Sequence, residues 1–573
     1  MEKSVSAQSL VLTSLSALTI LLSSSSATAD EITEFDRAQE LVRSENWSEA
    51  IQILDGLIDT NRWQGGYWHY RGVAHARSGN CESGLSDFQD ALSLGSFGTG
   101  SWIRHALFEA AACASTTGRV DLALDYLSEA NGRYDLNIGA RTEDDDRFDA
   151  VRHEQEFLWL TGSDTEGLSR NEGWRHDLRW FQDLMIRRHP DPFHTTPEAE
   201  WNAFAEELYR NIPTLEDVEV VAGFMRLAAM IQDGHTSVYP PFDGELAFSI
   251  LPIWPYELEG RWTIVAAEPT YINLVGAELV AIEGVPIDEA MATIASHMTS
   301  DHPETIRWLG TIALQLSDVG AAFLGGEHTD RLALTLAHPG SGEFDTTLMG
   351  HPIDRDIMSR WIPEGWTSIA SEVPPLWLSA LDQTFHVAEF TNQDTIYAQI
   401  NQIRDGERLE FSEFASQLND RLATTNAQHL ILDLRHNNGG NGNLNRDLVH
   451  AIIRNESINR PGGLFVITGR RTFSAAQLLI NALESQTEAL FVGEISSSSP
   501  AFFGEDTTVE MPWSGLQASI SSRWFQNRFM YDDQRPWIPM DMQADLTKSD
   551  LVHGTDPAMS AILNHIESTA MTD

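Results

Sequence analysis

Two short apolar runs in the last third of the chain, residues 430–434 and 464–468, each end in a polar turn that contains glycine. Each turn leads into a stretch that begins as a helix. A buried strand followed by a turn and a helix is the pattern of parallel βα units. Because ligands bind at the carboxyl ends of the strands in open α/β sheets, the pattern predicts a functional site at these two turns.

The two turns carry different chemistry. The first contains Gly439 and Gly440, whose N–H groups can approach a substrate closely because glycine has no Cβ. The second contains Ser474 at a helix start, where the N–H of Ala475 points toward whatever the hydroxyl attacks. A nucleophilic hydroxyl beside converging backbone donors is what acyl transfer requires. Taken alone, each turn is better explained as an N-cap serine or a simple glycine turn.

The pattern over residues 30–135 is helical and repetitive. The segment that starts at Asn46 returns 34 residues later at Asn80, and a looser copy starts at Gly118. This period, with small residues at the helix crossings, resembles tetratricopeptide repeats, which present a concave face to a peptide or partner protein. The two cysteines, Cys81 and Cys113, fall at the same end of neighbouring predicted helices, so either a disulfide or two buried thiols fit the pattern.

The other segments are recognised by changes in this pattern. Residues 1–29 combine a basic start, an apolar stretch and a small-residue cleavage site, which predicts a signal peptide and an exported, periplasmic or extracellular protein. That stretch is too short for a membrane span, and no later stretch approaches one. Residues 136–170 are charged and aperiodic and are interpreted as a linker. Helical spacing returns over residues 171–235, and residues 236–300 suggest strands.

Composition narrows the function classes. The formal charge of −47, from 84 acidic and 37 basic residues, argues against nucleic acid or anionic lipid as a partner. Lysine is nearly absent, since only Lys3 and Lys548 occur. No cluster of His, Cys, Asp and Glu has metal-ligand spacing, so neither a metal nor another cofactor is predicted.

Four motifs in order give the most specific signal. They resemble the D-G-H-T, D-L-R-x-N-x-G-G, nucleophile and V-G-E elements of the S41 serine peptidases, a family that includes the tail-specific (C-terminal processing) and tricorn core proteases. The matching residues are Asp233-Gly-His-Thr236, Asp433-Leu-Arg-His-Asn-Asn-Gly-Gly440, Thr472-Phe-Ser-Ala-Ala-Gln477 and Val492-Gly-Glu494. Ser474 falls where the family carries its nucleophile.

The resemblance also implies an architecture. We expect a multidomain α + α/β protein in which the tetratricopeptide-like repeats precede a helical cap over residues 171–235. Residues 276–288 resemble the second half of a PDZ module, so residues 236–300 are predicted to be PDZ-like. Residues 301–573 are expected to form the α/β catalytic core, of the crotonase- or ClpP-like type.

The catalytic base is predicted to be a histidine. Common tail-specific proteases use a lysine about 25 residues after the serine, but this chain has Ser496-Ser-Ser-Ser-Pro500 there and no lysine nearby. Tricorn-type members use a histidine instead, and His235 matches it; its ordinary pKa suits a base at neutral pH. By the same resemblance the third member is Asp533, with Asp532 as the alternative, and Gly439, Gly440 and Ala475 supply the oxyanion hole.

Two hypotheses of different class follow. The first is an exported serine peptidase that cleaves polypeptides with a Ser–His mechanism and recruits a protein partner through its repeats. The second is a non-catalytic binding module on the same scaffold. Intact Ser474, His235 and both glycines favour the enzyme.

Overall fold

The computed structural model describes residues 31–95, 101–134, 136–242, 244, 246–325, 330–352, 361–390, 394–526 and 533–570. The signal peptide predicted over residues 1–29 and the alternative site residue Asp532 lie outside these ranges. The chain divides into two compact units, Met1–Leu168 with Ile186–Arg188, and Ser169–Met185 with His189–Asp573. Across the described ranges, no helix is both long and apolar enough to cross a bilayer.

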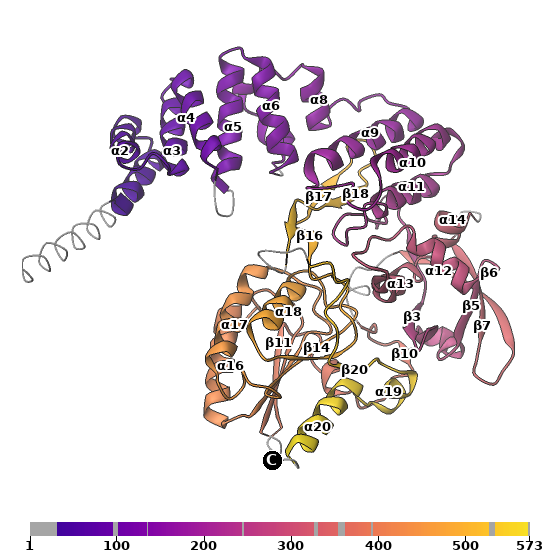
Figure 1. The fold of residues 1–573 in the computed structure, drawn as a ribbon. Coiled ribbons are helices and arrows are strands. Elements are labelled where there is room, and N and C mark those ends of the chain that lie inside the picture. The colour runs from indigo at the N-terminus through magenta and orange to yellow at the C-terminus, as the bar shows by residue number, and fades with distance from the viewer. Residues whose placement is uncertain are drawn as a thin grey trace, which may run out of the picture. The chain divides into compact units, whose positions relative to one another are not determined.

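The first unit is a row of helices, each of which contacts the next along the chain (Figure 1). Small residues let neighbouring helices approach closely, because a Cβ on Gly72 would lie 2.8 Å from the Phe88 ring. Cys81 and Cys113 form a disulfide with their Cα atoms 5.0 Å apart, as one of the two sequence alternatives predicted. The helices are α2 (Trp47–Thr60), α3 (Gly65–Arg77), α4 (Cys81–Leu94), α5 (Ser101–Thr116) and α6 (Val120–Gly132).

The interpretation of residues 136–170 as a linker is wrong. This segment forms α7 (Ile138–Thr142), η1 (Asp146–Phe148) and α8 (Gln155–Thr161). Phe148 and Phe157 are buried in the same apolar core as α5 and α6. The charged residues before Phe148 interrupt the helical spacing of the buried apolar positions, so the sequence pattern looked aperiodic.

The second unit begins with three helices, as the pattern over residues 171–235 predicts. Two of their starts carry a reciprocal capping box, formed by Ser169 and Glu172 before α9 and by Glu216 and Glu219 before α11. Trp174, Trp201 and Phe224 are fully buried on the inner faces. The helices are α9 (Arg170–Arg188), α10 (Glu198–Asn211) with η2 (Ile212–Thr214), and α11 (Asp217–Ala229).

A seven-stranded sheet follows, in the order β10-β4-β5-β7-β8 with β3 on β4 and β6 on β5. It corrects the boundary predicted at residue 300, because strands beyond that residue pair with strands before it. The local alternation of short strands could not show which later strands would join. The elements are β3 (Ile253–Leu258), β4 (Arg261–Ala267), η3 (Pro269–Leu274), β5 (Glu278–Ile282), β6 (Val285–Pro286), α12 (Ile287–Ala295), η4 (Pro303–Thr305), α13 (Ile306–Ala313), α14 (Val319–Leu324), β7 (Arg331–Ala337), β8 (Glu343–Met349) and β10 (Thr367–Ser368).

A second sheet carries the predicted βα units. Its order is β11-β12-β13-β14-β15-β20, parallel from β12 onward and antiparallel at the β11 edge. Both faces are buried, since α16, α17 and α18 cover one face and α20 covers the other (Figure 1). The elements are η5 (Leu376–Leu378), β11 (Phe385–Phe390), β12 (Thr395–Ile400), α16 (Phe411–Thr425), β13 (His429–Asp433), η7 (Gly442–Leu444), α17 (Asn445–Arg454), β14 (Leu464–Thr468), α18 (Ala475–Gln486), β15 (Leu490–Gly493), β20 (Met542–Gln543), α19 (Lys548–His553) and α20 (Pro557–Ala570).

Short strands join the helical segment to this core. The D-G-H-T segment leads into β1, which pairs with β18 far along the chain, so His235 is held beside the later part of the core. These strands are β1 (Ser237–Val238), β2 (Ser249–Ile250), β9 (His351–Pro352), β16 (Phe502–Gly504), β17 (Thr507–Glu510), β18 (Gln517–Ile520) and β19 (Arg523–Phe525).

Candidate active site

Ser474 stands between the end of β14 and the start of α18, as the sequence predicts. Its backbone has φ +56° and ψ −120°, a conformation that L-residues rarely adopt and that costs on the order of 1–3 kcal/mol. The surrounding structure enforces it: Phe473 N–H donates to the Asn437 carbonyl at 3.0 Å, and Ser474 N–H donates to Ser498 Oγ at 3.0 Å. This sharp turn presents the Ser474 hydroxyl to the cavity beside it.

His235 reaches Ser474 across 239 residues of sequence, with its Nε2 2.8 Å from Ser474 Oγ. Asp233 fixes the turn that carries it, because Asp233 Oδ1 accepts the His235 N–H at 2.9 Å and Oδ2 accepts the Thr236 hydroxyl. At the other side, Ser519 Oγ donates to the His235 carbonyl at 2.7 Å. The D-G-H-T motif thus forms a hydrogen-bonded turn that positions the imidazole ring of His235.

The environment of the His235 ring keeps it neutral. The ring is stacked between Phe473, with centroids 4.4 Å apart, and Phe502, with centroids 5.4 Å apart. Burial lowers the pKa of His235, although the charges of Asp233 and Asp506 act in the opposite direction. A neutral imidazole can accept a proton from the Ser474 hydroxyl, so this arrangement can act as nucleophile and base.

The predicted third residue, Asp533, does not orient this ring. Both Asp533 oxygens accept hydrogen bonds from Arg535, which also pairs with Glu484. His235 Nδ1 is buried and makes no hydrogen bond of normal geometry to any described residue, although the Phe503 carbonyl lies near enough to raise the His235 pKa. The resemblance to the peptidase family predicted Asp533, but the guanidinium of Arg535 binds the Asp533 carboxylate.

Asp506 is the acidic residue that shares the cavity with His235 and Ser474. It follows the β16 strand, and its charge favours the protonated form of His235, raising the pKa of that ring. No motif marked this residue in the sequence, since it lies alone in a loop between two short strands.

His189, which directly follows α9, also belongs to the surroundings of the site, although no motif marks it in the sequence. It is 3% exposed, and its Nε2 lies 3.2 Å from Asp233 Oδ2. Burial alone would raise the Asp233 pKa, but this hydrogen bond and the charges of His235 and His189 outweigh burial and lower it. Asp233 therefore stays ionised beside the catalytic turn.

The glycine loop lies directly against the nucleophile. A Cβ on Gly439, whose φ is +113°, would lie 2.7 Å from Ser474 Cβ, so only glycine fits there. The Gly439 N–H donates to Asn437 Oδ1 at 3.0 Å and is already occupied. Of the predicted oxyanion donors, the N–H groups of Gly440 and Ala475 have no hydrogen-bond acceptor among the residues that the structure describes.

Two further motif residues are explained by ion pairs under the site. Arg435 of the D-L-R element forms two parallel hydrogen bonds with the carboxylate of Asp556, which directly precedes α20. Glu494 of the V-G-E element forms another with Arg470, at 2.5 and 3.0 Å. These pairs fix the ends of β13, β14 and β15, from which the two catalytic turns emerge.

The lysine position of the tail-specific proteases is replaced by a serine loop. Ser498 accepts the Ser474 N–H, and the Ser499 N–H donates to Asp301 Oδ2 at 3.2 Å. Lys548 donates to the Gly276 carbonyl at 2.7 Å, in the region of the seven-stranded sheet. The described part of the chain therefore offers His235, and no lysine, at the Ser474 hydroxyl.

Ser474 and His235 open into a cavity of about 470 Å³. Its walls are largely apolar and come from α11, α13, α14 and the segment after β1. The apolar lining residues are Met225, Val238, Phe242, Met298, Trp308, Leu309, Ile312, Ala313, Leu316, Phe323 and Phe473. Among the residues described, no group of His, Cys, Asp and Glu is arranged to hold a metal ion.

Comparison with known proteins gives a structural match alone. No protein-family model and no curated protein matches the sequence. The crystal structure of a CPAF mutant matches with a TM-score of 0.51 and 13% identity, over 69% of this chain and 96% of that chain. The photosystem II D1 C-terminal processing protease (15% identity, 68% of this chain and 99% of that chain) has a TM-score of 0.32. The tricorn protease (13%, 70% and 37%) has a TM-score of 0.34.

The last two scores are too low to carry an argument, and the CPAF match bears on the fold alone. It covers 69% of this chain and 96% of that chain. This chain therefore shares its fold with CPAF.

Proposed function

We propose that this protein is a serine peptidase that cleaves polypeptides with Ser474 as nucleophile and His235 as base. The observation that carries the proposal is the 2.8 Å contact between His235 Nε2 and Ser474 Oγ, made by a buried imidazole and a serine in strained backbone geometry. A binding module would need neither the contact nor the strain.

The reaction follows from this geometry. Ser474 Oγ attacks the scissile carbonyl while His235 Nε2 takes its proton, and the Gly440 and Ala475 N–H groups stabilise the oxyanion. His235 then returns the proton to the leaving amine, and a water, activated in the same way, hydrolyses the acyl-enzyme. Asp506, at the edge of the cavity, balances the charge of the imidazolium in place of Asp533.

The cavity beside Ser474 supports a preference within polypeptides. Its apolar walls and volume of about 470 Å³ fit a bulky apolar side chain next to the scissile bond. Phe323 and Leu316 are among the apolar residues that line the cavity. Peptides with Leu, Phe or Met at that position are the expected substrates.

Export and partner binding belong to the same proposal. Residues 1–29 have the pattern of a cleaved signal peptide, and the Cys81–Cys113 disulfide suits an oxidising compartment such as the periplasm. The helical unit has the repeat period of tetratricopeptide proteins, which supports a role in recruiting a protein partner.

The test is hydrolysis of an unfolded polypeptide by the wild type and by Ser474→Ala. We expect turnover by the wild type and its loss in the variant, because the remaining groups cannot supply a nucleophile. Exposed Ser549→Ala, in α19, is the matched control and should retain turnover. Equal cleavage by wild type and Ser474→Ala, or none by either, would leave the scaffold as a binding module.

A further inference from the structure

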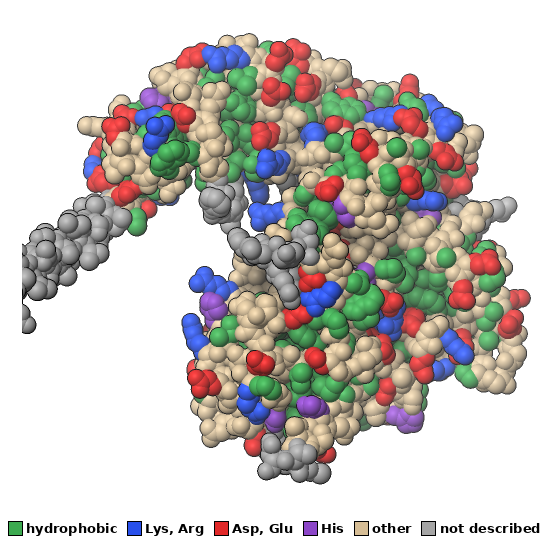
Figure 2. Space-filling model, in the orientation of Figure 1, with side chains coloured by type: hydrophobic (Ala, Val, Ile, Leu, Met, Phe, Trp, Pro, Cys, Tyr) green, Lys and Arg blue, Asp and Glu red, His purple; other side chains and the backbone are tan. Residues whose placement is uncertain are grey.

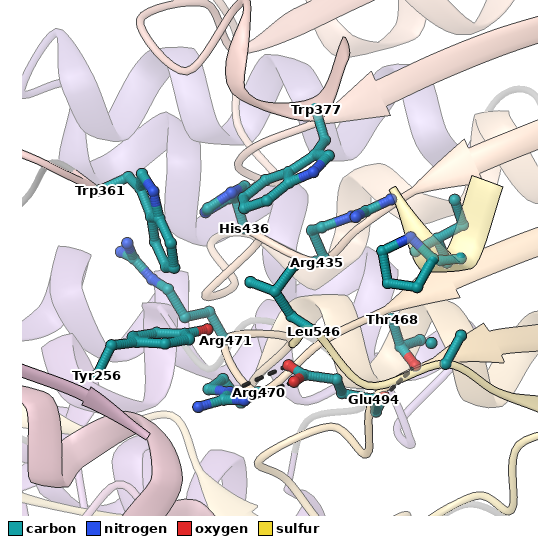
Figure 3. Close-up of a pocket in the computed structure, with 15 residues that line it drawn as sticks. Tyr256, Trp361, Trp377, Arg435, His436, Thr468, Arg470, Arg471, Glu494 and Leu546 are labelled. Atoms are coloured by element: carbon teal, nitrogen blue, oxygen red, sulfur yellow. Dashed lines mark hydrogen bonds and ion pairs between the residues drawn. The ribbon is translucent and has the colours of Figure 1, made fainter. Parts of the chain in front are cut away.

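Three arginines line a cavity at the carboxyl ends of β13 and β14 (Figure 3). Arg435 follows β13, and Arg470 and Arg471 follow β14. Tyr256, Trp361 and Trp377 form the aromatic walls. The arrangement places three permanent positive charges beside aromatic rings in a chain whose net charge is −47.

Two of these arginines are neutralised within the protein. Arg435 pairs with Asp433 and Asp556, each at 2.9 Å, and lies over the Trp377 ring. Arg470 pairs with Glu494 at 2.5 Å and with Glu257 at 3.4 Å. Their roles are structural, since both guanidinium groups tie strand ends together.

Arg471 has no such partner. No carboxylate of a described residue forms an ion pair with it, and its buried Nε–H has no hydrogen-bond acceptor in the described part of the chain. In Figure 3 its side chain lies between Tyr256 and Trp361 and points away from Glu494. Burial lowers the pKa of Arg471, although the side chain as a whole is half-buried. A half-buried guanidinium without a described counter-ion would be stabilised by a bound anion.

Other donors at the same place are also unsatisfied. Trp361 and Trp377 are 6% and 3% exposed, and neither indole N–H meets an acceptor among the described residues. His436 stacks on Trp377, and its Nε2 is likewise buried without a described partner. Polar side chains without described partners thus line the same cavity as Arg471, and such groups can serve an anion site.

The anion would arrive along an open groove of about 660 Å³ that Arg471, His436 and Trp361 border. Its described lining residues include two arginines, Arg404 and Arg471, and one acidic residue, Asp382, so the groove carries a net positive charge. Asn438 lines both this groove and the Ser474 cavity. A chain bound across Ser474 can therefore continue into the groove.

We propose that Arg471 binds a carboxylate of the polypeptide substrate, in an inference that rests on the proposed peptidase function. Arg471 stands three positions before Ser474 in the chain, so their Cα atoms are at most about 11 Å apart, roughly the span of three extended substrate residues. The bound carboxylate thus lies within a few residues of the scissile bond. It belongs either to an Asp or Glu side chain or to the C-terminus of the substrate, and both fit the planar guanidinium fork.

The test compares kcat/KM on fluorogenic peptides that differ by one carboxylate. One series moves a single Glu, against Gln, through the five positions on each side of the scissile bond, and a second compares a C-terminal acid with its amide. In the wild type we expect one position, or the free C-terminus, to favour the carboxylate on the order of tenfold or more. In Arg471→Met this ratio should fall close to one, and Arg471→Lys should give an intermediate ratio.

The matched control is Arg454→Gln, at an exposed position of α17 outside the groove. It also removes one positive charge and should keep the wild-type preference for the carboxylate. No carboxylate preference in the wild type, or a preference that survives in Arg471→Met, would overturn the proposal.

A binding measurement separates this proposal from the proposed function. Fluorescein-labelled acidic and amidated peptides are titrated onto Ser474→Ala, with and without Arg471→Met, and fluorescence anisotropy gives Kd. Tighter binding of the acidic peptide, lost with Arg471→Met, supports the site even if the wild type hydrolyses nothing. Equal Kd values for both peptides on Ser474→Ala overturn the site even if the wild type is an active peptidase.

Discussion

Asp301 is predicted to make the stability of this protein fall as the pH rises toward 8. Its carboxylate joins the two halves of the site, because Oδ1 accepts the Gly234 N–H at 2.7 Å and Oδ2 accepts the Ser499 N–H at 3.2 Å. Burial, and then the charge of Asp233, raise the pKa of Asp301 to about 7, against these hydrogen bonds. The folded protein therefore holds a proton on Asp301 that the unfolded chain has already lost.

The sign and the size follow from proton linkage. Between the unfolded pKa of 3.8 and the folded pKa of about 7, the folded state binds more protons, so the free energy of unfolding decreases as the pH rises. At about 1.4 kcal/mol per pH unit, the loss from pH 5.5 to pH 8 is about 2 kcal/mol. Asp301→Asn cannot ionise and lacks this contribution.

The assay is urea unfolding at pH 5.5 and pH 8, followed by tryptophan fluorescence, for the wild type and Asp301→Asn. Buried histidines and other groups titrate in both proteins and cancel in the comparison. From pH 5.5 to pH 8, the free energy of unfolding of the wild type should fall by about 2 kcal/mol more than that of Asp301→Asn. Exposed Asp288→Asn, in α12, is the control for the same chemical change. If the free energies of unfolding of wild type and Asp301→Asn changed equally with pH, Asp301 would not be the source of the pH dependence.

Three further predictions concern other parts of the molecule. Gly439→Ala should lower kcat/KM by on the order of a hundredfold or more, because the new Cβ would lie 2.7 Å from Ser474 Cβ and displace the nucleophile; a variant with near-normal peptide hydrolysis would exclude this packing. Replacing both Cys81 and Cys113 by Ser should lower the free energy of unfolding of the helical unit by about 3–4 kcal/mol, the value expected for a 32-residue separation. Thiol titration of the unreduced, denatured wild type should find no free thiol. With 84 acidic against 37 basic residues, the thermal midpoint should rise from low to near-molar sodium chloride, and a flat or falling midpoint in calorimetry would show that the charges are already compensated.

The sequence could predict the elements whose pattern is local. The apolar runs at residues 430–434 and 464–468 became β13 and β14, shifted by one residue at most, and Ser474 stands at the helix start where it was expected. The motif at His235 indicated the second half of the site because several residues within it hydrogen-bond to one another. Interactions between residues close in the chain produce local sequence patterns that can be recognised.

The parts that depend on distant contacts could not be predicted. Asp506 and Asp301 meet the catalytic turn only after folding, and neither belongs to a motif. Asp533 was expected from spacing, but Arg535, two residues away, holds its carboxylate. The continuation of the first sheet beyond residue 300 depends on strand pairing, which alternation within a single strand does not specify.

The most direct test of the central claim is the rate at which a small fluorophosphonate labels Ser474. We expect mass spectrometry to find the label on Ser474 of the wild type, and His235→Ala to slow labelling by on the order of a thousandfold, since the 2.8 Å contact supplies the base. Labelling of His235→Ala at the wild-type rate, or of a residue other than Ser474, would contradict the central claim.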